Sequence, residues 1–244
     1  VIGRTSVSPT PIVFIMTGMG PQWWGMGQTL FHSEPVFRTA LEACDKIFQE
    51  LSGKSILEDM LKGEAESQMT DPEVSQPANL FLQWALYKLW TSWGVEPDMV
   101  VGHSVGEVTA ACISGAISLD EAIRIIYHRS RLQQDAQGTG AMLAVGLAPD
   151  ETEKLIAPYE NKISIAAINS PIAVTVSGEK DAINRLEDQL LDLDIYCKRL
   201  QVKVAYHSQM MDPYHDAFIE AIGDLKTKSP RIPMISTVTG RPVD

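Results

Sequence analysis

The chain has 244 residues, of which 45% are hydrophobic and 21% are charged. This length and composition are typical of one large globular domain, or of a domain that carries a smaller inserted one, and they favour neither a disordered nor a fibrous protein. The formal net charge of −11 argues against a nucleic-acid-binding protein, because neutralising phosphates requires a basic surface. No apolar run is long enough to cross a bilayer and no signal-peptide pattern opens the sequence, which predicts a cytoplasmic protein without membrane contact.

The cysteines predict neither a disulfide framework nor a metal site. Cys44, Cys112 and Cys197 are far apart and lack C-x-x-C spacing. We interpret them as buried apolar side chains. The sequence begins at Val1 and stops just after a strand-like run at 234–238, which we interpret as a piece of a longer polypeptide.

The first part of the chain predicts a strand followed by a glycine-rich loop. Residues 1–10 read as a linker, and the apolar run 11–16 predicts a buried parallel strand. The next segment, 17–27, contains four glycines, which allow backbone N–H groups to converge on an anion or a developing oxyanion. We place Gln22 at that point. A flexible loop is the alternative, and a phosphate loop is disfavoured because G-K-[ST] is missing.

Two amphipathic helices follow, at 33–51 and 75–93. Gln76 lies at the start of the second helix, where it is either a surface residue or a side chain that faces a site. We expect the tryptophans of this helix to belong to the core: Trp84, Trp90 and Trp93.

The segment 99–107 carries the strongest catalytic signal. Three apolar residues run into Gly-His-Ser-Val-Gly, and a helix-compatible stretch follows. This is the pattern of a strand, a sharp turn and a helix that expose a serine at the top of a sheet. Gly102 and Gly106 fit such a turn, because side chains there would collide. The sequence therefore predicts Ser104 as a nucleophile.

Beyond the serine the pattern changes twice. The stretch 119–134 predicts a helix on which at most one of Arg129 and Arg131 turns inward. Residues 140–203 then predict the order β-α-β-β-α-β, with strands at 140–147, 163–168, 173–177 and 196–202 and helices at 150–159 and 179–193. That order is typical of a ferredoxin-like unit, here inserted into the main body. The chain returns at 204–212, and a helix follows at 213–225.

A serine hydroxyl needs a base within hydrogen-bond reach, usually a histidine. Of the five histidines, His32 and His215 belong to helical segments, His128 adjoins an arginine, and His103 sits beside the serine with its ring directed elsewhere. His207 remains, at the point where the chain returns from the insert. A structural histidine is the alternative interpretation.

Taken together, these motifs resemble the acyltransferase domains of polyketide and fatty acid synthases, relatives of malonyl-CoA:acyl carrier protein transacylase. The resemblance runs in order from about residue 11 to the end. It rests on the GMGPQ loop, the GHSVG turn with Glu107, the helix 128–131, the turn 169–171 and the AYHS segment. It implies an α/β fold with an α/β-hydrolase-like large subdomain (11–139 and 204–244, truncated at its C-terminus) and a ferredoxin-like small subdomain (140–203).

The resemblance also implies roles for individual residues. Ser104 would be acylated and His207 would be its general base, while the oxyanion would be bound by the backbone amides of Gln22 and Val105. Arg129 would bind the carboxylate of the acyl group, because its planar fork can pair with both oxygens. The other substrate-binding residues that it implies are Gln76, Asn169, His103 and Tyr206.

An aromatic residue before the histidine, here Tyr206, favours malonyl over methylmalonyl in that family. The partners implied are malonyl-CoA or a related acyl-CoA, an acyl carrier protein whose phosphopantetheine accepts the acyl group, and neighbouring domains such as a ketosynthase. No bound cofactor or metal is implied. Two departures matter: Met19 and Pro21 fill the variable places of the glycine-rich motif, and the last portion of the family domain, which braces the histidine, is missing.

Two other readings remain open at this level. A serine esterase or thioesterase would use the same turn, but the sequence between Ser104 and His207 offers no compelling acid to orient the base. A non-catalytic docking domain could have kept the fold alone. The presence of Ser104, Arg129 and His207 argues against that reading.

Overall fold

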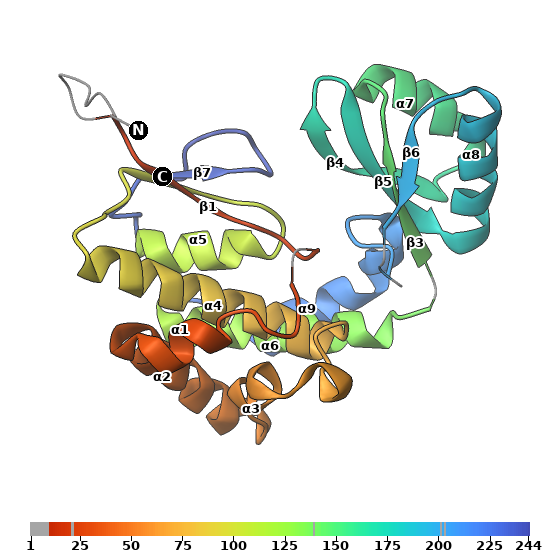
Figure 1. The fold of residues 1–244 in the computed structure, drawn as a ribbon. Coiled ribbons are helices and arrows are strands. Elements are labelled where there is room, and N and C mark those ends of the chain that lie inside the picture. Colours follow the sequence, from red (N-terminus) through yellow and green to blue (C-terminus); the bar gives the residue numbers. More distant parts are fainter. Residues whose placement is uncertain (1–9, 21, 139, 201, 203) are drawn as a thin grey trace, which may run out of the picture. The chain divides into compact units, whose positions relative to one another are not determined.

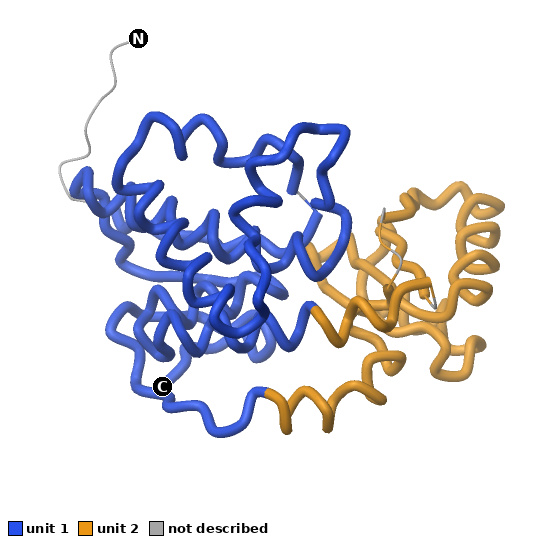
Figure 2. Tube along the Cα trace, turned by 90° about the horizontal axis from the view of Figure 1, so that it is seen from below, with its two compact units in different colours: residues 1–130, 222–244 blue, residues 131–221 orange. Residues whose placement is uncertain are grey.

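The computed structural model describes residues 10–20, 22–138, 140–200, 202 and 204–244. The chain divides into two compact units (Figure 2). Unit 1 comprises the residues up to 130 together with 222–244, and unit 2 comprises residues 131–221. The chain leaves unit 1 within helix α6 (Leu119–Asp135) and returns to it within helix α9 (His215–Ile222), so unit 2 is an insertion in the sequence of unit 1.

Unit 1 is built on a parallel three-stranded sheet in the order β1-β2-β7 (Figure 1). The strands are β1 (Val13–Met16), β2 (Met99–Gly102) and β7 (Met234–Ser236). Their register pairs Met16 with Gly102 and Gly102 with Ser236, so all three strands end at the same edge. In open parallel sheets, ligands bind outside the carboxyl ends of the strands. The segments that follow these three residues are therefore the natural place for a site in unit 1.

Helices form the rest of unit 1. Helix α5 (Gly106–Ser114) packs on all three strands, and α4 (Pro72–Ser92) packs on α5. An outer layer beyond α4 consists of α1 (Gln28–Ser33), α2 (Pro35–Ser52) and α3 (Ile56–Leu61), visible in red to orange in Figure 1. A short 3-10 turn, η1 (Glu64–Glu66), connects α3 to α4.

Helix α2 shows why these segments are helical. Pro35 occupies its first turn, where its fixed φ suits a helix and its missing N–H costs nothing. The helix ends at Gly53, whose φ of 72° is left-handed and free of strain only in glycine. Between these points the buried side chains recur every three or four residues along one face, at Phe37, Leu41, Cys44 and Phe48.

Unit 2 contains the predicted order of elements. They are β3 (Gly140–Val145), α7 (Pro149–Ile156), β4 (Ile163–Ser170), β5 (Ala173–Glu179), α8 (Lys180–Asp192) and β6 (Cys197–Arg199), with a 3-10 turn η2 (Ala157–Tyr159) after α7. The sheet is antiparallel in the order β4-β5-β3-β6, which is the ferredoxin-like arrangement. Helices α7 and α8 pack against this sheet (Figure 1). The amphipathic face of α8 is fully buried at Ala182, Ile183, Leu186 and Leu190, and each of the three larger side chains contributes about 1.5–3 kcal/mol.

The structure departs from the predicted elements in several places. Helices α1 and α3 were not predicted, and α4 begins at Pro72 rather than at 75, which places Pro77 inside the helix. Trp90 and Trp93 are exposed and stack edge to face, so their assignment to the core was wrong. The predicted helix 213–225 is a 3-10 turn, η3 (Gln209–Tyr214), followed by α9.

The bounds of the units also differ from those expected. The compact inserted unit extends beyond 140–203 at both ends, and of the predicted linker 1–10 only Thr10 is among the described residues. Among the helices of the described residues, none is long and apolar enough to span a membrane.

Candidate active site

Ser104 lies in the turn between β2 and α5, at the carboxyl edge of the unit 1 sheet. Its φ of 53° is in the left-handed region that residues other than glycine rarely adopt. The flanking glycines make this turn possible. A Cβ on Gly102 would lie 2.4 Å from the backbone of Glu107, and a Cβ on Gly106 would lie 2.1 Å from the carbonyl oxygen of Met16. The sequence predicted this strand, sharp turn and helix, and all three are present.

The glycine-rich loop lies directly against this serine. A Cβ on Gly18 would approach the Cβ of Ser104 to 3.2 Å and Nδ1 of His103 to 2.9 Å. Helix α4 holds the loop in place: Nδ2 of Asn79 donates to the carbonyl oxygen of Gly18 (3.4 Å), and Nε2 of Gln83 donates to that of Thr17 (2.8 Å). Glycine at position 18 is therefore required by the close approach of the loop to the serine turn.

Within the described part of the chain, the backbone N–H groups of Gln22, in the glycine-rich loop, and of Val105, directly after Ser104, have no acceptor. The side chain of Gln22 is turned back onto its own loop, because its Oε1 accepts a hydrogen bond from the N–H of Gly20 (2.6 Å). Val105 is the N-cap of α5, where the helix dipole adds partial positive charge. Both N–H groups are chemically suited to an anionic oxygen.

Arg129 and Gln76 meet in unit 1. Nη1 of Arg129, on α6, donates a hydrogen bond to Oε1 of Gln76, on α4. Gln76 is fully buried and Arg129 is half-buried, whereas Arg131 is exposed. Gln76 is neutral, so this hydrogen bond orients the guanidinium of Arg129 without placing a negative charge beside it.

The remaining predicted residues belong to unit 2. His207 is exposed and follows Tyr206, which is buried at 7% exposure. Their segment packs within unit 2, because a Cβ on Gly140 of β3 would lie 2.4 Å from the Cβ of Ala205. Asn169, on β4, is exposed, and its Nδ2 donates to Oγ1 of Thr175 on β5 (2.9 Å). The pairing of Ser104 with His207 stays a prediction.

The backbone of His207 is strained in the same way as that of Ser104, with a φ of 58°. The described non-glycine residues with positive φ are Ser104, Glu160, Asn161, Asp194 and His207. Asn161 and Asp194 are of the types that tolerate this conformation in turns, and Glu160 precedes Asn161 in one such turn. Histidine is also among the types enriched at positive φ and serine is not, so the conformation of Ser104 is the more unusual of the two. Backbone strain of this kind clusters at functional sites.

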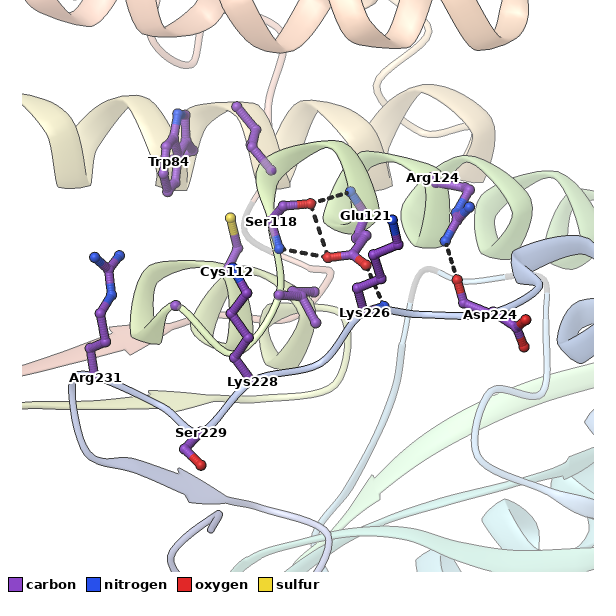
Figure 3. A pocket seen from close by; sticks show the side chains of 13 residues that line it. Trp84, Cys112, Ser118, Glu121, Arg124, Asp224, Lys226, Lys228, Ser229 and Arg231 are labelled. Carbon is purple, nitrogen blue, oxygen red and sulfur yellow. Dashed lines mark hydrogen bonds between the residues drawn. The ribbon is translucent and has the colours of Figure 1, made fainter.

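A cavity of about 680 Å³ in unit 1 contains none of the predicted site residues (Figure 3). It lies at the C-terminal end of α5, opposite to the Ser104 end, and is lined on one side by residues 224–231. Figure 3 shows the carboxylate of Glu121 engaged by Ser118 and by the backbone of Lys226. These hydrogen bonds lower the pKa of Glu121. Because α5 is roughly 13 Å long, this cavity is separate from the serine turn.

Sequence reasoning missed one part of the site. Oε1 of Glu107 accepts hydrogen bonds from the backbone N–H and the hydroxyl of Thr237. The GHSVG motif places Glu107 after the serine turn, but no motif in the sequence points to Thr237. The two residues are 130 positions apart, so no local pattern could have paired them.

Comparison with known proteins identifies the family. The acyl transferase domain family matches residues 13–244. This chain belongs to the acyltransferase domain family. Among curated relatives, it is 37% identical over 238 residues to a reducing polyketide synthase of Gibberella moniliformis, covering 96% of the chain and 10% of that relative. It is 33% identical over 242 residues to an erythronolide synthase of Saccharopolyspora erythraea, covering 99% of the chain and 7% of that relative.

Solved acyltransferase structures have the same fold. The loading acyltransferase of the avermectin polyketide synthase has a TM-score of 0.90 and 34% identity, covering 96% of this chain and 74% of that one. FabD from Acinetobacter baumannii has a TM-score of 0.85 and 26% identity, covering 97% and 76%. The α/β fold with an inserted ferredoxin-like subdomain is thus confirmed. The acyltransferase domain described here spans a tenth or less of the first curated relatives, which are much longer proteins.

Proposed function

We propose that this acyltransferase domain moves a malonyl group from coenzyme A to Ser104 and then to the phosphopantetheine thiol of an acyl carrier protein. The donor is an acyl-CoA, the acceptor thiol belongs to the carrier protein, and the domain itself binds no cofactor or metal. Neighbouring synthase domains, such as a ketosynthase, would use the product. The cytoplasmic location stays a prediction from the sequence.

The first half-reaction forms an ester. Oγ of Ser104 attacks the thioester carbonyl while His207 takes the hydroxyl proton, and the tetrahedral intermediate collapses with loss of the CoA thiol, which receives that proton. The N–H groups of Gln22 and Val105 would bind the oxyanion. In the second half-reaction the carrier thiol attacks the ester, His207 takes the thiol proton, and Ser104 leaves with it. After the two half-reactions, Ser104 and His207 have returned to their starting protonation states.

The observation that supports a dicarboxylic acyl group as the substrate is the hydrogen-bonded pair of Arg129 and Gln76. A guanidinium oriented by a buried amide presents the planar donor fork that would pair with the free carboxylate of malonyl. An esterase acting on neutral esters has no use for such a group. Asn169, His103 and Tyr206 would line the acyl and pantetheine path, and Tyr206 would fill the space that the methyl of methylmalonyl requires.

The test is the mass of the Ser104 peptide after the full-length protein is mixed with malonyl-, methylmalonyl- and acetyl-CoA. Ser104→Ala should remove all acyl mass, and His207→Ala should slow both loading and transfer to carrier protein, since one base serves both steps. Ser52→Ala is a matched control, because that hydroxyl makes only local hydrogen bonds at the end of α2.

Persistent acyl mass in the Ser104→Ala protein would refute the proposed nucleophile. An acyl-enzyme that is hydrolysed as fast as it forms, with no transfer to carrier protein, would instead identify an esterase. Loading of His207→Ala at the parent rate would mean that a different group is the base.

A further inference from the structure

The conformation of Ser104 has to be held by its surroundings. A non-glycine residue at positive φ costs of order 1–3 kcal/mol and persists only where neighbouring structure over-determines it. Within the turn itself, the N–H of Gly106 donates to the carbonyl oxygen of His103 (2.9 Å), and the N–H of Glu107 donates to that of Ser104 (3.0 Å). These bonds close the turn but do not fix the distance between its two ends.

Thr237 joins those two ends from outside. Its hydroxyl lies 2.9 Å from the carbonyl oxygen of Gly102, where β2 ends, and 2.7 Å from Oε1 of Glu107, in the first turn of α5. Its backbone N–H donates to the same carboxylate oxygen. A hydroxyl has one proton, so it donates to only one of these two oxygens at a time. When the hydroxyl donates to Gly102, Thr237 is hydrogen-bonded to both ends of the turn, because its backbone N–H donates to Glu107 at the same time.

The position of Thr237 follows from the sheet. Ser236, the last residue of β7, pairs with Gly102, the last residue of β2, so the next residue along the chain reaches the edge where the serine turn begins. Residues 102 and 107 bracket Ser104 on both sides. One side chain, on the residue directly after β7, therefore contacts both ends of the turn that carries Ser104.

We propose that Thr237 and Glu107 are positioning residues that hold the Ser104 turn in its strained, exposed conformation. The claim that this conformation speeds acylation rests on the proposed function, whereas the restraint on the turn does not. Thr237 is exposed, so water can replace its hydroxyl at both partners, and its loss should disturb the geometry of the turn more than it lowers the stability of the fold.

The experiment compares Thr237→Val and Thr237→Ser in the full-length protein, with Thr239→Val as the matched control. Valine has nearly the same shape as threonine and leaves the backbone N–H in place. Serine restores the hydroxyl. Thr239 lies two residues further along, and its hydroxyl only accepts one local hydrogen bond, from the N–H of Arg241 (3.3 Å).

Two quantities are measured: hydrogen exchange at the amides of residues 106 and 107 by mass spectrometry, and the single-turnover rate constant for acylation of Ser104. Thr237→Val should speed exchange by about fivefold, as expected for one lost hydrogen bond. It should lower the acylation rate constant by about tenfold at saturating malonyl-CoA, with little change in the acyl-CoA concentration at half-saturation. For Thr237→Ser and Thr239→Val, the exchange rates and the acylation rate constant should stay near those of the parent protein.

Unchanged exchange at residues 106 and 107 in Thr237→Val would overturn the restraint. If exchange is faster but the acylation rate constant is unchanged, Thr237 does not position Ser104 for acylation. If only the acylated fraction falls, with the rate constant of the parent, Thr237 contributes to the stability of the fold and the positioning proposal is overturned. If no CoA ester acylates the parent protein, the proposed function fails. The exchange comparison then still decides whether Thr237 holds the turn.

Discussion

Replacing Gln76 with leucine tests the origin of carboxylate recognition. Gln76 is fully buried on α4, and its Oε1 accepts a hydrogen bond from the guanidinium of Arg129. Leucine has a similar volume and suits a buried helical position, so the fold should persist while the orienting acceptor is lost. Arg129 would then adopt several rotamers or turn toward solvent.

The magnitude follows from that hydrogen bond. A hydrogen bond to a charged group contributes about 1.5–3 kcal/mol, which corresponds to roughly a 10- to 150-fold effect. Because Arg129 is only half-buried, water replaces part of the lost interaction, and we expect the lower end of that range. Gln76→Leu should therefore lower the preference for malonyl-CoA over acetyl-CoA about tenfold.

The assay is competition between the two CoA esters, read as the ratio of malonyl to acetyl mass on the Ser104 peptide. Arg129→Ala is the reference, and Arg185→Ala, an exposed arginine on α8, is the control. If Gln76 acts through Arg129, adding Gln76→Leu to Arg129→Ala should change the ratio no further. Independent, additive effects, or a parental ratio in Gln76→Leu, would refute the reasoning.

The other predictions concern specificity, stability and thiol reactivity. Tyr206→Ser should raise the ratio of methylmalonyl to malonyl loading in a competition assay. The increase should reach at most about tenfold to two-hundredfold, which is the discrimination that one methyl group in an apolar pocket provides. An unchanged ratio would refute the steric explanation. Asp45→Ala should lower the free energy of unfolding by about 3 kcal/mol in urea titration, because the buried carboxylate accepts from the N–H groups of Ile56 and Leu57 at the start of α3 and from two side chains. Burial, with a smaller contribution from Asp120, raises the pKa of Cys112 to about 12, so iodoacetamide at pH 8 should leave it unmodified in the folded protein, as peptide mapping would show.

Much of the fold could be predicted from the sequence because its signals are local. The alternation of strands and helices in 140–203 specified the ferredoxin-like unit, and the glycines around Ser104 specified a turn that other residues could not form. Short or irregular segments were missed: α1 has no buried residue and α3 is a six-residue helix, so neither has a clear hydrophobic period. The exposure of Trp90 and Trp93 depends on where α4 ends relative to the rest of unit 1, which the composition of the helix does not specify.

By itself, the sequence determined the family, the sharp turn that carries Ser104 and the candidate residues for acyl transfer, since each is encoded within a few neighbouring positions. Only the tertiary structure decided which distant residues meet. The contact between Arg129 and Gln76 spans 53 positions, and that between Thr237 and Glu107 spans 130. Such contacts depend on strand register and helix packing. Both result from the packing of many side chains along the chain, so no local sequence pattern predicts which distant residues meet.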